Sequence, residues 1–184
     1  MLQTAKLSIK DYQKIVETGI FCDRRIELIE GQLIEMSPET PYHANSNNKI
    51  YKYFLTLFNH LADVRSAHPI SLSTSEPQPD LVLAKLPDSL YNNKHPEPED
   101  IYLVIEISYS TLSYDLNEKK QVYAKANISE YWIIDLENCR LIIFQDPQQE
   151  TYHKKLELNN GSVSCLTFPD VQIEIKKLIG SIDF

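Results

Sequence analysis

Two acidic residues occupy positions where the hydrophobic pattern predicts buried β-strands. Glu106 interrupts the apolar run Ile101–Ile107, and Asp80 comes directly before the run Leu81–Ala84. A carboxylate on a buried strand is costly to desolvate unless it is paired with a positive charge or holds a cation. Taken singly, each residue is more often an acid at a strand end, exposed to water or salt-bridged. A catalytic interpretation therefore depends on a third group that faces both carboxylates.

A lysine occupies an unusual place on the helix predicted after Glu106. Apolar residues recur along one face of this helix, at Leu112, Leu116, Tyr123 and Ala126. Position 119 is the missing member of that stripe, so Lys119 is predicted to point inward. Such a lysine can simply extend along the rim of the core. If it faces two strand carboxylates instead, the trio could bind a divalent cation and orient or activate a water molecule.

The segments that must position these residues are predicted from the spacing of apolar side chains. Helices are predicted between residues 8 and 19 and at about 43–61 and 113–126; hairpins are predicted at 26–36 and 131–144, and strands within 64–85 and at 101–107. This order of elements predicts an α/β or α+β fold in which helices flank one main sheet.

The composition is that of one folded domain. The chain has 184 residues, of which 42% are hydrophobic and 24% charged, and it is too apolar for a disordered protein. The Pro-rich loop at 87–98 is interpreted as an excursion within the fold, because neither side of it alone would hold enough core. We therefore expect a single domain over residues 1–184.

Composition also disfavours several classes of site. The four glycines form neither GxGxxG nor GxxxxGK[ST], which excludes these two phosphate-binding loops. The five histidines form no HExxH motif or close pair, so zinc has little support. The three cysteines form no CxxC pair and indicate a reducing, cytoplasmic location. No apolar run approaches the roughly 18 residues that span a bilayer.

The net charge of −8 argues against a non-specific polyanion binder, whose affinity comes from clustered Lys and Arg. It does not exclude a nuclease, because metal-dependent nucleases collect carboxylates at their site.

Several segments together resemble a known family. They are residues 27–38 with His43, residues 75–81, residues 98–108, the positions Tyr114, Asp115 and Lys119, and residues 123–135. This combination resembles the Uma-type restriction endonuclease family, formerly a domain of unknown function, within the PD-(D/E)XK nuclease superfamily. The resemblance covers roughly residues 8–150. It implies a restriction-endonuclease-like core, with a mixed central β-sheet flanked by helices.

The resemblance also implies roles for individual residues. Asp80 would belong to the PD element and Glu106 would be the acid of the (D/E)XK element. Ser108 stands where that element usually carries a lysine. In similar families the lysine has moved onto the following helix, and Lys119 is the position that matches it. The carboxylates, with the Ile107 carbonyl as a third ligand, would bind Mg²⁺ or Mn²⁺. Glu27 would be a further acid at the site, or an exposed acid on an edge strand.

The implied activity is metal-dependent endonucleolytic cleavage of DNA, and by analogy the protein would be a homodimer. Two alternatives stay open at this point. The first is a catalytically weakened relative that serves as a nucleic-acid-binding or regulatory module, which would account for Ser108 and the acidic surface. The second is a metal-dependent phosphohydrolase with another substrate. His43 would line the cleft or make local hydrogen bonds, and Tyr131 and Trp132 are expected in the core.

Overall fold

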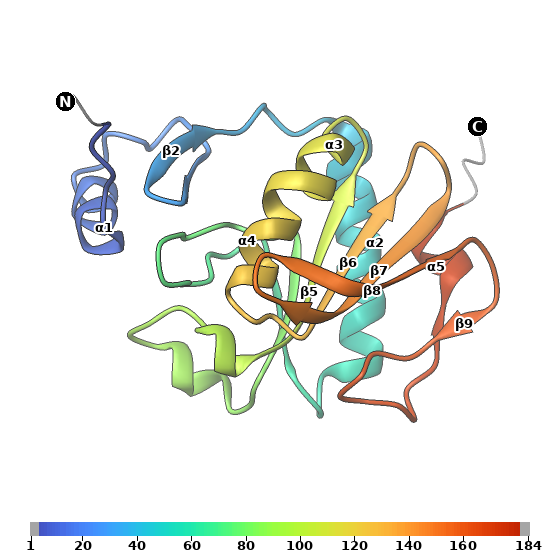
Figure 1. The fold of residues 1–184 in the computed structure, drawn as a ribbon. Helices are drawn as coiled ribbons and strands as arrows, with labels where there is room; N and C mark the ends of the chain where they lie inside the picture. Colours follow the sequence, from blue (N-terminus) through green and yellow to red (C-terminus); the bar gives the residue numbers. More distant parts are fainter. Residues whose placement is uncertain (1–3, 181–184) are drawn as a thin grey trace.

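The computed structural model describes residues 4–180, and the predicted domain of residues 1–184 extends past this range at both ends. Within this range there are five α-helical segments, α1 (Ile9–Glu17), α2 (Pro41–Phe58), α3 (Leu112–Tyr114), α4 (Lys120–Lys125) and α5 (Ile175–Ile179). A π-helical segment, η3 (Asp115–Lys119), joins α3 to α4, and two 3₁₀ segments, η1 (Asp88–Tyr91) and η2 (Pro98–Asp100), lie before β5. Figure 1 shows these elements around a central sheet.

The central sheet has six strands in the order β3-β4-β5-β6-β7-β8. Their bounds are β3 (Asp63–Ser66), β4 (Leu81–Ala84), β5 (Ile101–Ser108), β6 (Glu130–Asp135), β7 (Arg140–Gln148) and β8 (Thr151–Leu158). Neighbouring strands are antiparallel except β5 and β6, which are parallel and connected by the α3-η3-α4 helix. The predicted mixed sheet flanked by helices is confirmed.

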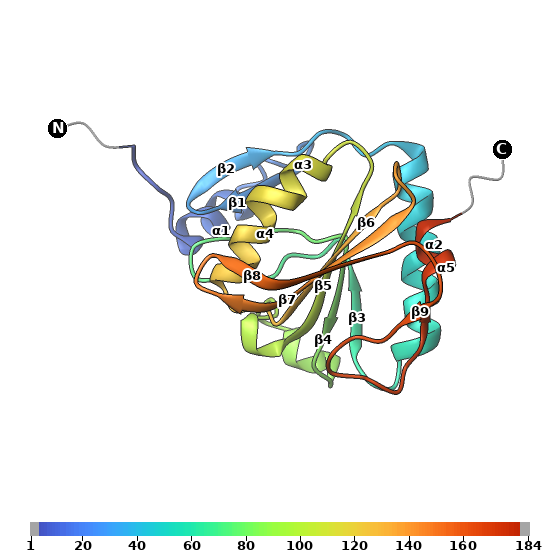
Figure 2. The same cartoon turned by 45° about the vertical axis from the view of Figure 1, so that its right-hand side comes forward.

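Each face of the sheet is covered by its own hydrophobic cluster. On one side, α2 and α5 pack against alternate residues of β5 such as Leu103 and Ile105. On the other side, the helix α3-η3-α4 packs against Val104 and the neighbouring strands. Figure 2 shows α2 and α5 on one side of the sheet and α3 and α4 on the other. Because side chains alternate along a strand, Glu106 points to the same face as Val104, toward α4.

A small hairpin lies apart from the main sheet. Its strands, β1 (Ile26–Ile29) and β2 (Gln32–Glu35), are antiparallel and joined at Glu30-Gly31, as the sequence predicts. Both turn residues have positive φ, and a side chain at position 31 would also collide with Lys6, so glycine is required there. The hairpin is tied to residues 74–76 through the Gly31 N–H, which donates to the Thr74 carbonyl at 2.9 Å.

The helix predicted at 113–126 is present but irregular. It begins at Leu112, and residues 115–119 form a π turn rather than α-helix. A π turn frees backbone groups from the i→i−4 pattern. One of them, the Asp115 carbonyl, accepts a hydrogen bond from the Tyr131 hydroxyl at 3.1 Å. The partner on β6 is distant in sequence, which is why spacing along the helix alone does not reveal the irregularity.

The remaining predicted elements are also found. The second helix begins slightly earlier than expected, at Pro41, because Thr40 caps its first turn through the His43 N–H, and it ends at Phe58. The hairpin β6-β7 forms as predicted, and Tyr131 and Trp132 are buried in the core. A last short pair, β9 (Ser162–Val163) and β10 (Ile173–Glu174), precedes α5. None of the helices within residues 4–180 combines the length and apolar character needed to cross a bilayer.

Candidate active site

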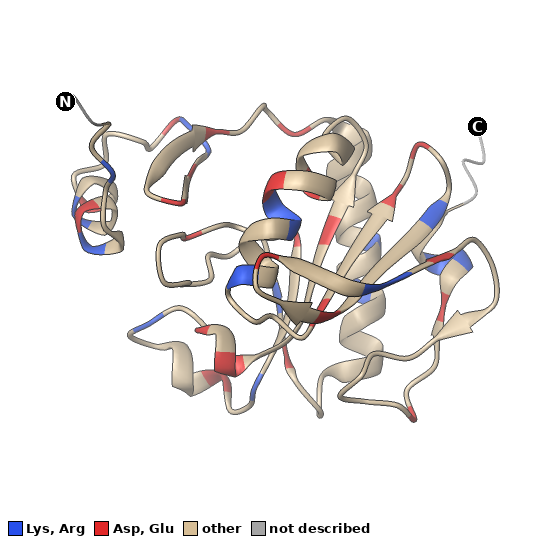
Figure 3. Ribbon diagram, viewed as in Figure 1, with Lys and Arg blue, Asp and Glu red and all other residues tan. Residues whose placement is uncertain are grey.

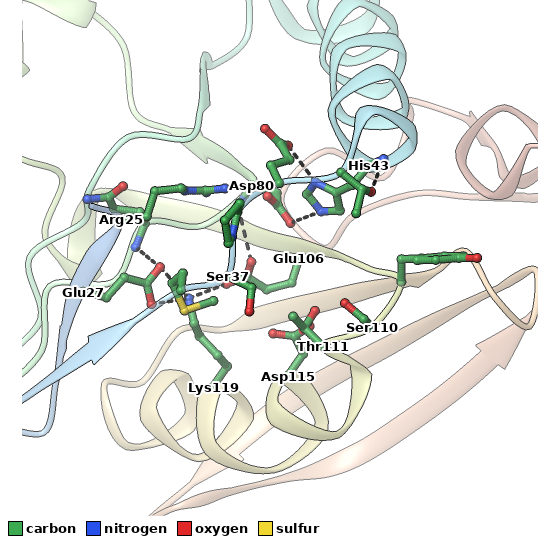
Figure 4. Close-up of a pocket in the computed structure, with 16 residues that line it drawn as sticks. Arg25, Glu27, Ser37, His43, Asp80, Glu106, Ser110, Thr111, Asp115 and Lys119 are labelled. Atoms are coloured by element: carbon green, nitrogen blue, oxygen red, sulfur yellow. Dashed lines mark hydrogen bonds and ion pairs between the residues drawn. The ribbon is translucent and has the colours of Figure 1, made fainter. Parts of the chain in front are cut away.

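An acidic pocket opens where β5 ends. It is bordered by the end of β5, the start of α2, the β1-β2 hairpin and the π turn (Figure 4). Five carboxylates line it, those of Glu27, Glu39, Asp80, Glu106 and Asp115. Its volume is about 90 Å³, well below the roughly 300 Å³ at which pockets begin to enclose small ligands. A ligand of more than a few atoms would therefore lie across its mouth.

The sheet places Asp80 and Glu106 opposite each other. Leu81, the first residue of β4, pairs with Ile105 of β5, so the preceding Asp80 comes level with Glu106. One oxygen of Asp80, Oδ2, accepts the Ile107 N–H at 2.7 Å, and the Asp80 N–H lies 3.4 Å from Glu106 Oε2. Both residues are buried but still border the pocket. The predicted juxtaposition of the two carboxylates is present.

Lys119 points inward, as its place on the helix predicts. Its Nζ donates to Glu106 Oε1 at 3.1 Å and to Glu27 Oε1 at 3.1 Å, and only 2% of its surface is exposed. Glu27 is also buried, and it accepts the Gln78 N–H at 3.0 Å. Of the two alternatives for Glu27, the exposed acid on an edge strand is wrong. The hairpin carries this carboxylate into the pocket beside Lys119 (Figure 4).

Burial and charge shift the ionisation of this cluster. Burial raises the pKa of Glu106, Lys119 lowers it in part, and the negative charges of Asp80, Asp115 and Glu27 raise it again, to about 8. Burial alone would lower the pKa of Lys119, but Glu106 and Glu27 reverse this and hold it above its ordinary value. The ammonium therefore stays charged, while the carboxylates repel one another and would gain from a further positive charge.

His43 connects α2 to the end of β5. Its Nε2 lies 2.6 Å from the Ile107 carbonyl and 3.4 Å from Asp80 Oδ2, and its Nδ1 lies 2.7 Å from Glu39 Oε1. Burial lowers the pKa of His43, but Asp80, Glu39 and the Ile107 carbonyl together raise this pKa by more, to about 9. His43 thus lines the pocket and makes hydrogen bonds there, which combines both sequence-based alternatives.

Tyr123 and Asp115 lie at the site but were not assigned roles from the sequence. The Tyr123 hydroxyl donates to Glu106 Oε1 at 2.7 Å, although Tyr123 was interpreted only as part of the apolar stripe. It lies four residues after Lys119, on the same helix face, so the spacing contained this signal. Asp115 accepts hydrogen bonds from Ser108 at 2.6 Å and Thr111 at 2.8 Å. Ser108, in place of the usual lysine, therefore anchors the start of the π turn.

The chemistry of the donor set fits a hard divalent cation. Asp80 Oδ1 accepts no hydrogen bond from residues 4–180, and Glu106 Oε2 has only the long contact to the Asp80 N–H. Each carboxylate thus keeps an oxygen available, and the Ile107 carbonyl lies beside them with one lone pair directed at His43. Within the described residues no three His, Cys, Asp or Glu side chains form a ready metal cage. A cation here would retain water ligands, as Mg²⁺ usually does.

Arg25 is a cation at this pocket that sequence reasoning missed. Within residues 4–180, Arg25 and Lys119 are the two basic residues that line the pocket. Lys119 pairs with Glu27 and Glu106, whereas Arg25 forms no ion pair with any residue of this range. Its neighbour Arg24 instead pairs with Glu35 on the outer surface, at 2.6 Å. Alternation along the chain into β1 separates the two guanidinium groups, so only Arg25 borders the pocket (Figure 4).

Comparison with known proteins finds one matching family and a similar solved structure, both described as nucleases. The family described as "Putative restriction endonuclease" (Uma2) matches residues 11–176. Among solved structures, the chain is similar to a "putative nuclease belonging to DUF820" from Anabaena variabilis, with 14% sequence identity and a TM-score of 0.73. The similarity covers 94% of this chain and 97% of that one, and at this identity it concerns the fold alone. No curated protein is similar enough to count as a match.

Proposed function

The chain belongs to the Uma2 family, described as "Putative restriction endonuclease", and from this and the geometry of the acidic pocket we propose that it is an endonuclease that hydrolyses DNA phosphodiester bonds with Mg²⁺ or Mn²⁺. The observation that carries the proposal is the meeting of Asp80, Glu106 and Lys119 in one pocket. Asp80 comes from the residue before β4, Glu106 from β5 and Lys119 from the π turn, and a structural core would have no need to bury this set of charges together.

The proposed role of the two strand carboxylates is to hold the cation. The oxygens of Asp80 and Glu106 that remain available would bind it, with the Ile107 carbonyl next to them. When bound, such a cation lowers the pKa of a coordinated water and offsets the charge of the attacked phosphate. His43 and the Ile107 N–H fix the orientation of Asp80 through its Oδ2.

Lys119 is proposed to orient the attacking water and to offset charge in the transition state. Its ammonium is held by Glu27 and Glu106, so it is placed without any change of rotamer during the reaction. Tyr123 adds a second donor to Glu106 Oε1, which leaves Oε2 to face the pocket. Glu27 then serves as a counter-charge that keeps the lysine in position.

Arg25 is proposed to bind a phosphate of the substrate. A phosphodiester carries a negative charge, and the five carboxylates of the pocket repel it. Lys119 is engaged by two of these acids, whereas the guanidinium of Arg25 has no such partner within residues 4–180. A guanidinium suits this task because it can donate two parallel hydrogen bonds to phosphate oxygens.

Cleavage of supercoiled plasmid tests the proposed activity. The wild type is incubated with Mg²⁺ or Mn²⁺ and with EDTA, beside Asp80→Ala and Lys119→Ala. The exposed loop acid Asp88, replaced by Ala, is the matched control. We expect nicking that requires the cation, persists in the control and is lost in both site variants. Cleavage unchanged in the site variants, or absent in the wild type, would overturn the proposal.

The homodimer expected by analogy remains a proposal. Two copies would present two pockets, which would suit cleavage of both strands of a duplex. Light scattering during size-exclusion chromatography, with and without a DNA duplex, distinguishes a monomer from a dimer.

A further inference from the structure

Two tyrosines form an exposed aromatic pair at the rim of the acidic pocket. The rings of Tyr42 and Tyr109 meet edge to face, with centroids 5.4 Å apart and an interplanar angle of 64°. Tyr109 leaves 45% of its surface exposed and Tyr42 leaves 36%. Every other aromatic side chain within residues 4–180 is buried or half-buried, so an exposed pair is an exception that needs a reason.

The pair is built on the same elements as the candidate active site. Tyr109 directly follows β5, three residues after Glu106, and lines the pocket. Tyr42 lies in the first turn of α2, directly before His43, which contacts the Ile107 carbonyl and Asp80. The two rings are therefore held in a fixed place relative to the carboxylates.

Charge limits how a nucleic acid could bind beside this pocket. Affinity for duplex DNA comes mainly from Lys and Arg contacts to phosphates. Here the net charge is −8, and the Lys and Arg residues are spread over several elements rather than gathered in one stripe (Figure 3). Stacking of a base on an aromatic ring supplies affinity without positive charge, and it tolerates any base sequence.

We infer that Tyr109 and Tyr42 form a stacking subsite for an unpaired nucleobase next to the cleaved phosphate, so that the preferred substrate is single-stranded or locally unpaired DNA. This inference rests on the proposed nuclease function. A base inside a duplex has both faces covered by its neighbours, and only an unpaired or extruded base can offer a face to a protein ring. The small pocket agrees with this arrangement, because it admits the phosphate chemistry but leaves the base at the rim.

A purely structural explanation of the pair is that it ties α2 to the end of β5. The two explanations differ in what a substitution does. A leucine at either position keeps an apolar contact between the elements but cannot stack on a base, whereas phenylalanine keeps both. If the rings stack on a base, the leucine variants should impair cleavage of unpaired substrates only, and the phenylalanine variant should cleave them like the wild type. A purely structural role predicts neither result.

The test compares cleavage of a single-stranded oligonucleotide with cleavage of a blunt duplex of the same sequence in Mg²⁺. The variants are Tyr109→Leu, Tyr42→Leu and Tyr109→Phe, with Leu156→Ala as a control because it removes an exposed apolar side chain on β8. We expect the wild type to prefer the single strand. Tyr109→Leu should lower kcat/KM on it by about tenfold or more, mainly through KM, with Tyr109→Phe and the control close to wild type.

Binding supplies a second measurement that does not depend on cleavage. A 2-aminopurine placed beside the expected cleavage position loses fluorescence when it stacks, and we expect this quenching in the wild type and in Tyr109→Phe but not in Tyr109→Leu or Tyr42→Leu. Thermal melting of each variant checks that it is folded.

The outcomes separate the inference from the proposed function. If the wild type cleaves the duplex at least as well as the single strand, or if Tyr109→Leu affects both substrates equally, the stacking subsite is wrong and the nuclease stands. If no DNA is cleaved with either cation, the proposed function fails, and the inference fails with it.

Discussion

At the scale of single residues, Lys119 has the most constrained environment in the pocket. Its ammonium is shared by Glu27 and Glu106 and is almost completely buried. Removing one partner of such a cluster leaves the other charges buried and unpaired, which typically costs about 3–5 kcal/mol. Lys119→Met should therefore abolish cleavage and lower the free energy of unfolding by about 3 kcal/mol or more, measured by urea denaturation.

Lys125 offers the matched control for this prediction. It lies on the same helix, but its ammonium pairs with Glu30 and Glu150 at the surface. Exposed pairs contribute about 1 kcal/mol or less, so Lys125→Met should change stability little and leave cleavage intact. The double variant Lys119→Met with Glu27→Gln should recover part of the lost stability but no activity. Equal destabilisation by both lysine variants would contradict the buried ion cluster.

Arg25 gives a prediction about substrate binding. If its guanidinium binds a phosphate, Arg25→Ala should raise KM for DNA by about tenfold with a smaller change in kcat, since charged hydrogen bonds are worth about 1.5–3 kcal/mol. Arg24→Ala removes the same side chain one residue away, where it pairs with Glu35 at the surface. Steady-state kinetics of both variants check the prediction, and a similar KM in the two would exclude a special role for Arg25.

The sequence contains enough information for part of this site. Asp80, Glu106 and Lys119 could be chosen because each is a charged residue at a position where the pattern demands an apolar one. Glu27 could not be decided, because its burial depends on how the hairpin packs against the rest of the chain. Arg25 gives no signal at all in the sequence, since two adjacent arginines look equivalent until the backbone directs them to opposite sides.

At the scale of elements, one hydrogen bond ties the π turn between α3 and α4 to the sheet. The Tyr131 hydroxyl donates to the Asp115 carbonyl, and both residues are buried. Tyr131→Phe would remove this bond, while the Lys120 N–H still donates to the same carbonyl, so the expected cost is about 0.5–1.5 kcal/mol. Because the same turn ends at Lys119, we expect kcat to fall as well.

Tyr152→Phe is the control for this prediction. Its hydroxyl donates to the Ile128 carbonyl at 2.8 Å, which is a bond of the same chemistry away from the pocket. Both variants should lose similar stability in thermal melts, and only Tyr131→Phe should lose activity per folded molecule. If activity falls equally in the two, the π turn has no particular role in placing Lys119.

Local signals predicted most of these elements. The Glu30-Gly31 turn and the apolar runs of β5 and β6 each belong to one short segment, so their structure is largely determined locally. The order of strands and the parallel pairing of β5 with β6 are long-range properties that periodicity alone does not specify. The resemblance to a known family implied a mixed sheet flanked by helices, but neither the strand order nor this parallel pair was predicted.

At the scale of the whole molecule, the acidic pocket should couple cation binding to stability. Asp80 and Glu106 are crowded with further carboxylates, and the raised pKa of Glu106 reflects that repulsion as well as burial. A cation that binds only the folded protein stabilises it by about 2.7 kcal/mol at a concentration 100 times its Kd. We therefore expect Mg²⁺ or Mn²⁺ to raise Tm by about 5–10 °C, at about 2–4 °C per kcal/mol for a chain of this size.

Differential scanning calorimetry at constant ionic strength tests this coupling. The reference contains NaCl in place of the divalent salt, so that general screening is the same in both samples. Asp80→Asn should remove the increase in Tm, and Asp88→Asn, which lies on an exposed 3₁₀ segment, should retain it. An equal increase in Asp80→Asn would place the bound cation elsewhere on the protein.

The distance along the chain between the members of the site has a consequence for biosynthesis. Glu27 and Lys119 are 92 positions apart, so their ion pair exists only once the hairpin has packed against the helix that follows β5. In a chain still emerging from the ribosome, or in a partly folded one, Lys119 would not yet be held between Glu27 and Glu106. The proposed nuclease would thus become active only on completion of the fold, and its incomplete forms would not damage the DNA of the cell that makes it.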